Sequence, residues 1–139
     1  MMAPSASARA EGTLLGRYSE AGDTAVEGNA VGLHSLARAA RAERAFIKLS
    51  TPGDGPEPYD GFLQEVSVEP GEGKIRITRD GSRLFIRGGL EAKALLADNV
   101  ELLADADPES GGHLHIDYHP DHFYLDATSE PLVIERITP

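Results

Sequence analysis

The sequence predicts an α+β protein in which an antiparallel sheet carries helices on one face. Short segments alternate polar with apolar residues, and two longer segments have apolar residues at helical spacing. These segments follow the same order in both halves of the 139-residue chain, and a shift of 60 residues places Val26-Glu27-Gly28 on Ile86-Arg87-Gly88. We therefore expect a tandem duplication of a ββαββ unit, with halves at residues 13–70 and 71–139 packed as one globular unit.

The first half follows a small, polar segment, residues 1–12, which we expect to be a disordered lead. A turn at residues 21–23 separates the two opening strands, and Asn29 is suited to cap the helix that follows. A loop rich in Gly and Pro, residues 51–58, precedes the last strand of this half. The expected strands are residues 13–18, 24–27, 45–50 and 62–69, and the expected helix is residues 30–44.

The second half shows the same order with clearer signals. Asp80-Gly81 is a hairpin turn sequence between two alternating strands, and Gly88-Gly89 ends the second of these strands. A loop at residues 107–112 ends the helix, and Pro131 restricts the start of the final strand. The expected strands are residues 74–78, 83–87, 113–119 with an extension at 123–125, and 132–137, and the expected helix is residues 90–104.

The composition excludes several classes of protein. The chain has no Cys, which excludes a disulfide framework and thiolate chemistry. Its first residues lack the apolar run of a secretory signal, and no segment approaches the length of a membrane span. We therefore expect a cytoplasmic protein that does not act in the membrane.

The negative charge is concentrated in one part of the chain. The net charge is −10, and the segment from Glu91 to Glu135 contains eleven acidic residues against a single base, Lys93. The rest of the chain has twelve acids and twelve bases. This balance argues against nucleic acid as a direct partner and fits a basic protein or cations, although acidity for solubility alone is an equal alternative.

The first helix carries the main group of bases. Arg38, Arg41 and Arg44 recur every three residues, which indicates a solvated face that pairs with acids of the second half. His34 lies alone on this helix, and we expect it at the surface or at the edge of the core.

Four of the five histidines lie between residues 113 and 122. Successive side chains of a strand point to opposite faces, so the expected strand has an apolar face and a face of ligand-like groups. Leu114, Ile116 and Tyr118 form the first face, and His113, His115, Asp117 and His119 form the second.

The second face fits two kinds of site. Imidazoles two residues apart can share a metal ion, and the spacing is similar to the His-x-His-x-Asp-His motif of metallo-β-lactamase-like hydrolases, except that Tyr118 occupies the position of the last His. His115 with Asp117 or Asp121 would also suit general acid–base catalysis, but no Ser with a nucleophile context lies nearby. The other interpretation is a wettable surface that contacts a protein partner.

Four segments of the second half resemble a known family. They are a strand of the form Leu-x-Ile-x-Gly, a helix at residues 89–97, His113-Leu114-His115-Ile116-Asp117, and residues 129–136. Together they resemble immunity-protein family thirty-two of bacterial polymorphic toxin systems, over residues 73–137. The resemblance implies a small non-enzymatic protein that binds and blocks a cognate toxin. It singles out His113, His115, Asp117 and residues 131–136 and assigns no catalytic role to them.

Neutralisation of a protein toxin, such as a nuclease with a basic cleft, is therefore the leading prediction, with no cofactor and an undefined oligomeric state. The predicted partner-binding residues are His113, His115, Asp117, His119, Asp121, Asp105, Asp107 and Glu109. The alternative is a divalent-metal protein or metal-dependent hydrolase that holds zinc through His113, His115, Asp117 and His119.

Overall fold

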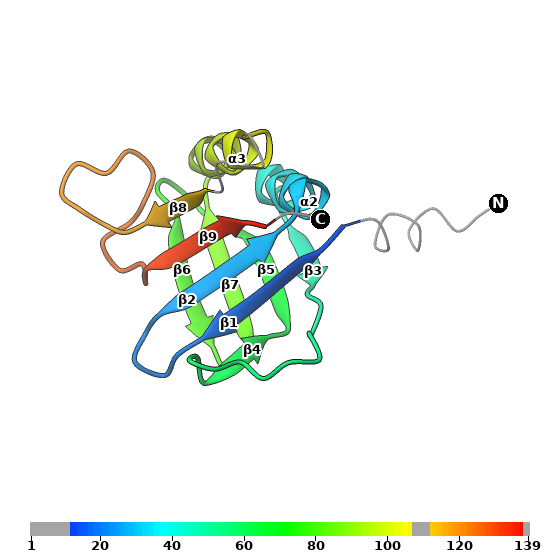
Figure 1. Cartoon of the computed structure of the whole chain (residues 1–139). Helices are drawn as coiled ribbons and strands as arrows, with labels where there is room; N and C mark the ends of the chain where they lie inside the picture. Colours follow the sequence, from blue (N-terminus) through cyan, green and yellow to red (C-terminus); the bar gives the residue numbers. More distant parts are fainter. Residues whose placement is uncertain (1–11, 107–111, 138–139) are drawn as a thin grey trace.

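The computed structural model describes residues 12–106 and 112–137 (Figure 1). The first half of the chain forms β1 (Leu14–Tyr18), β2 (Thr24–Gly28), α2 (Ala30–Arg41), β3 (Ala45–Lys48), β4 (Gly61–Leu63) and β5 (Glu65–Pro70). The second half forms β6 (Arg76–Asp80), β7 (Arg83–Gly88), α3 (Leu90–Ala104), β8 (His113–Ile116) and β9 (Leu132–Arg136). The predicted α+β class is confirmed.

The strands form two sheets rather than the single antiparallel sheet that the sequence predicts. Sheet A has the order β4-β1-β2-β9-β8, and sheet B has the order β3-β5-β7-β6. Both sheets are mixed, because β2 pairs with β9 in parallel and β5 pairs with β7 in parallel. The prediction was wrong on this point because alternation identifies a strand but does not identify its partner.

Each half of the chain contributes strands to both sheets. In sheet A the hairpin β1–β2 pairs with β9 of the second half, which in turn pairs with β8. In sheet B the hairpin β6–β7 pairs with β5 of the first half, which in turn pairs with β3. The two sheets therefore share one arrangement, β1-β2-β9-β8 in sheet A and β6-β7-β5-β3 in sheet B, in which the two middle strands are parallel and the outer pairs are antiparallel. Common ancestry of the halves, and hence the tandem duplication, stays a prediction.

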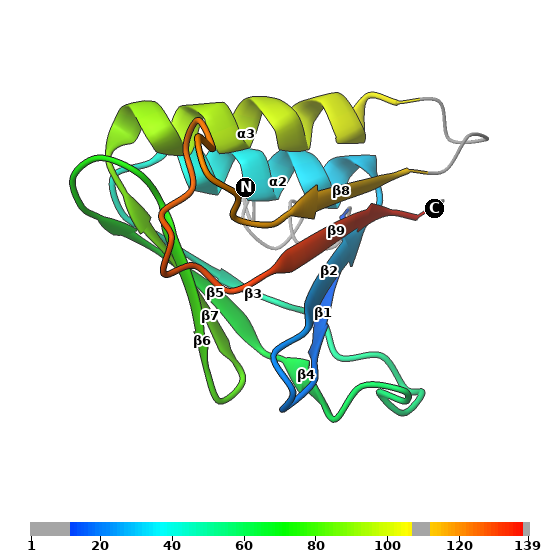
Figure 2. The ribbon, with the colours of Figure 1, turned by 90° about the vertical axis from the view of Figure 1, so that its left-hand side faces the viewer.

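The core lies between the two sheets and the helix pair. Figure 2 shows the sheets diverging like the sides of a wedge, with α2 and α3 side by side across its open end. Leu33 of α2 and Leu96 of α3 are almost fully buried, as are Ile134 of sheet A and Val66 of sheet B. Side chains from both halves thus share one hydrophobic cluster.

Several element boundaries differ from the predicted ones. The expected strand at residues 62–69 is divided at Gln64 into β4 and β5, which belong to different sheets. The expected strand at residues 113–119 ends at Ile116. Residues 123–125 add no strand; instead, Leu125 forms an isolated bridge with Ile75.

The predicted cap of the first helix is confirmed. Asn29 Oδ1 accepts hydrogen bonds from the backbone amides of Gly32, at 2.9 Å, and Thr13, at 3.0 Å. These two bonds join the start of α2 to the chain just before β1. In the described residues, no helix is both long enough and apolar enough to cross a membrane. Most of the expected lead, residues 1–11, lies outside the described residues.

Candidate functional site

Strand β8 presents two histidines on the side of sheet A that faces away from the core. Ile116 is fully buried and Leu114 packs against the core, whereas His113 and His115 are exposed. The predicted alternation is therefore confirmed for these four residues. It arises because β8 covers the core with one side only.

Strand pairing extends this face across the sheet. His113 lies opposite Glu135 of β9, which lies opposite Glu27 of β2. A second line of paired residues runs across all five strands: His115 of β8 lies opposite Val133 of β9, which is followed by Ala25 of β2, Arg17 of β1 and Phe62 of β4. We call these eight side chains the outer face of sheet A.

The outer face has an acidic centre with basic groups beside it. Glu27 and Glu135 are direct neighbours on parallel strands, an arrangement in which like charges repel each other. Arg17 forms an ion pair with Glu27, and its guanidinium lies 5.5 Å from the centroid of the Phe62 ring. On the other side, His113 Nε2 lies 3.6 Å from Glu135 Oε2. Sequence reasoning missed Glu27, Arg17 and Phe62, since only the strand order places them beside β8.

The predicted row of four polar side chains stops after two. Because β8 ends at Ile116, the alternation of the strand does not extend to Asp117 and His119, which are both exposed. His119 Nδ1 instead lies 2.9 Å from the carbonyl oxygen of Pro120. Asp121 is exposed in the same loop and has a positive φ of 71°.

The four residues proposed as alternative zinc ligands, His113, His115, Asp117 and His119, do not form a metal site in the structure. The rings of His113 and His115 lie 6.1 Å apart between centroids. Within residues 12–106 and 112–137, no three His, Asp or Glu side chains are grouped so that they could hold a metal ion. The residues proposed as zinc ligands therefore lie on a strand and a loop without a common centre.

His122 has a structural role that the sequence did not reveal. Its Nδ1 accepts hydrogen bonds from the backbone amides of Tyr124, at 3.2 Å, and Leu125, at 3.1 Å. Its carbonyl oxygen accepts a hydrogen bond from Lys74 Nζ at 2.7 Å. Burial lowers the pKa of His122, and the nearby His119 and Lys74 lower it further. His122 thus anchors the loop after β8.

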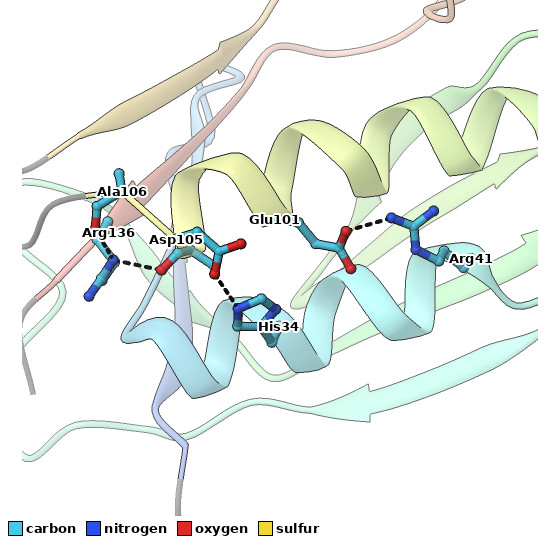
Figure 3. Close-up of polar contacts among 7 residues, drawn as sticks. His34, Arg41, Glu101, Asp105, Ala106 and Arg136 are labelled. Atoms are coloured by element: carbon cyan, nitrogen blue, oxygen red, sulfur yellow. Dashed lines mark hydrogen bonds and ion pairs between the residues drawn. The ribbon is translucent and has the colours of Figure 1, made fainter.

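Acids of α3 face the bases of α2 (Figure 3). Asp105 Oδ1 lies 2.8 Å from His34 Nε2, and Arg41 donates to Asp98 and Glu101 at 2.7 Å each. These hydrogen bonds raise the pKa of Arg41. The predicted pairing of helix bases with acids of the second half is confirmed for Arg41. Asp105 contacts α2, while Asp107 and Glu109 lie outside the described residues.

Comparison with known protein families gives a match for part of the chain. Residues 83–137 match the family model of immunity protein 32. This match confirms the resemblance of the second half of the chain. A search of the curated proteins found no match, and neither did a search of the solved structures.

The region that matches immunity protein 32 runs from β7 to the end of β9. It therefore includes both strands that carry His113, His115, Val133 and Glu135 on the outer face of sheet A. It also includes Arg136, a buried residue whose Nη1 donates to the carbonyl oxygens of Ala104, at 2.7 Å, and Ala106, at 3.0 Å (Figure 3). Arg136 thus caps the last turn of α3 from a neighbouring strand.

Proposed function

We propose that this protein is a non-enzymatic immunity protein that binds a cognate protein toxin and neutralises it. The observation that carries the proposal is the match of residues 83–137 to immunity protein 32. The proposal places the protein in the cytoplasm, with a protein rather than a nucleic acid or a membrane as its partner. It involves no catalytic residue and no cofactor.

The outer face of sheet A is the surface that we propose for the toxin. Its histidines and Phe62 combine apolar surface with polar or aromatic character, which suits an interface that must also remain wettable in the free protein. The adjacent carboxylates of Glu27 and Glu135 favour a basic group on the partner, because such a group would relieve their mutual repulsion.

The acids of the second half then have two different roles. Asp98, Glu101 and Asp105 already pair with α2, so they contribute to the long-range field more than to direct contacts. Asp117 and Asp121 are exposed in the loop that follows β8, next to the proposed surface along the chain. We include His119 of this loop in the proposed contact region, as the sequence suggests.

The test begins with the genes beside this one, among which the proposal expects a gene for the toxin. Co-expression should protect cells from that toxin, and the two purified proteins should form a stoichiometric complex. A charge reversal, Glu135→Lys, should weaken the complex by at least about 30-fold, or about 2 kcal/mol, because it places a cation where a basic partner is expected. Glu72→Lys is the matched control: it makes the same change in net charge at an exposed residue before β6, and it should leave the affinity within about threefold.

Two results would contradict the proposal. If the protein forms no complex with the neighbouring toxin, the proposed immunity function is wrong. If the two charge-reversal variants bind the toxin equally well, the outer face of sheet A is not the contact surface. Metal analysis of the purified protein adds a separate check. Stoichiometric zinc that is lost on changing His113 and His115 to Ala would favour the metal protein instead.

A further inference from the structure

A cavity of about 350 Å³ opens at the end of sheet A where β2 and β9 begin. Three separate segments form its walls: the β1–β2 turn, the loop before β4, and the residues leading into β9. The lining residues that matter for its chemistry are Asp23, Thr24, Pro58, Tyr59, Pro131 and Val133.

The walls of this cavity are fixed by hydrogen bonds between distant segments. The backbone amide of Asp60 donates to the carbonyl oxygen of Tyr18 at 2.8 Å, and Asp60 Oδ2 accepts from the amide of Glu20 at 2.7 Å. Within the turn, the backbone amide of Ser19 donates to the carbonyl oxygen of Asp23 at 2.8 Å. The cavity is therefore formed before any partner arrives, which lowers the entropic cost of binding.

The lining combines negative charge with flat apolar surface. Asp23 is exposed and contributes a carboxylate, while Tyr59, Val133 and two prolines contribute the apolar part. Thr24 is only 4% exposed, and its hydroxyl has no hydrogen-bond partner among the described residues. A buried hydroxyl without a partner is uncommon, because leaving it unpaired costs free energy.

The surroundings of the cavity are acidic. Asp23 lines the cavity, and two further acids, Glu20 and Asp60, lie on the β1–β2 turn and on the loop before β4, where Asp60 Oδ2 accepts the amide of Glu20. None of the described lining residues is a Lys or an Arg. Arg79, which contacts this turn, donates to Glu20 at 3.0 Å, and its guanidinium carbon lies 4.2 Å from the centroid of the Tyr18 ring. The local charge thus favours a cationic occupant.

We propose that this cavity receives an arginine side chain of the protein partner, an inference that rests on the proposed function. Asp23 pairs with the guanidinium, and Tyr59 provides the face on which its plane stacks. Hydroxyls that line the cavity accept the remaining N–H groups. An arginine inserted into a preformed pocket is a common anchor of protein interfaces.

The cavity is continuous with the proposed contact surface. Val133 lines the cavity and also lies between His115 and Ala25 on the outer face of sheet A. One partner could therefore cover the histidines of β8 and place an arginine at the beginning of β9 within a single interface.

The experiment is a titration of the full-length, ¹⁵N-labelled protein with Nα-acetyl-arginine methylamide, followed by NMR. We expect saturable shifts at the amides of residues 19–24 and 59 at about millimolar probe, as is usual for one side chain. Nα-acetyl-citrulline methylamide, which has the same shape without the charge, should produce no saturable shift. Asp23→Asn should weaken binding about fivefold, while Asp54→Asn, the same change at an exposed residue of the loop before β4, should not.

The possible failures can be told apart. Equal responses to the arginine and citrulline probes, shifts centred elsewhere, or no effect of Asp23→Asn would overturn the cavity as an arginine site. A lysine probe that binds as tightly as the arginine probe would overturn the role of stacking on Tyr59. None of these measurements needs the toxin, so the cavity can fail while the immunity function stands, and the reverse also holds.

Discussion

At the residue scale, His122 can act only as a neutral acceptor at Nδ1, because both of its partners there are backbone amides and amides can only donate. Protonation of Nδ1 would break both bonds and would place a cation beside Lys74 and His119. Lys93 illustrates the opposite case. It is the single base in the acidic segment, yet it is fully buried, and its Nζ donates to the carbonyl oxygens of Glu43 and Glu69 rather than to a surface acid.

We predict that His122 makes stability depend on pH. Its pKa in the folded protein lies below the ordinary value of 6.5, so the unfolded chain binds the proton more readily. The stabilisation is complete above pH 6.5 and is lost as the pH falls from there through the pKa of the folded state. Urea unfolding at pH 7.5 and pH 5.5 should show a lower midpoint at pH 5.5.

Two variants separate His122 from the other histidines. His122→Ala should lose about 1–3 kcal/mol at pH 7.5, because two backbone amides lose their acceptor, and should depend less on pH. His115→Ala, at an exposed position, should keep the pH dependence of the parent protein. If His122→Ala depends on pH as strongly as the parent protein does, another group carries the effect.

At the element scale, the helix α3 receives its C-terminal cap from a side chain of strand β9. The last turn of α3 contains no basic residue, so the negative end of the helix is not compensated from within. Arg136 of β9 supplies the positive charge and donates to the carbonyl oxygens of Ala104, the last residue of α3, and of Ala106, two residues beyond it. The attachment of α3 to sheet A therefore depends on a residue more than thirty positions away along the chain.

Arg136→Met should lower the free energy of unfolding by about 2–3 kcal/mol, since a charged donor to two carbonyls is lost while the apolar stem is largely kept. Urea unfolding monitored by circular dichroism measures the change. Arg38→Met, at an exposed position of α2, is the control and should change stability by no more than about 0.5 kcal/mol. Similar losses for the two variants would show that the cap contributes little.

The sequence predicts the elements well and their arrangement poorly. Alternation and helical spacing identify both helices and most strands, and Asn29 marks the start of α2 correctly. The division at Gln64 leaves no sign in the residue pattern, because residues on both sides of it suit a strand. Similarly, His113 and His115 could be predicted from β8 alone, whereas Glu27 and the cavity depend on pairing between distant segments.

At the scale of the whole molecule, the charge of −10 is not gathered into one patch. Acids of α3 face bases of α2, and those beside the cavity come from the first half. The net field still extends beyond the surface by about 10 Å at moderate ionic strength. Such a field orients a basic partner during its approach even where individual acids are already paired.

Association with a basic toxin should therefore slow steeply with added salt. We expect the association rate constant to fall about tenfold between 50 mM and 500 mM NaCl, with a much smaller change in the dissociation rate. Stopped-flow fluorescence measures both rates. An association rate that does not respond to salt would show that the negative charge serves solubility rather than encounter.

The parallel pairing of β2 with β9 has a consequence for how the protein is made. Strand β2 is synthesised early, yet one of its two edges stays without its partner until β9, the last strand of the described chain, has left the ribosome. Sheet A is then completed only after β9 has been synthesised. A chain that terminates before β9 would therefore lack the centre of the outer face of sheet A, including Val133 and Glu135.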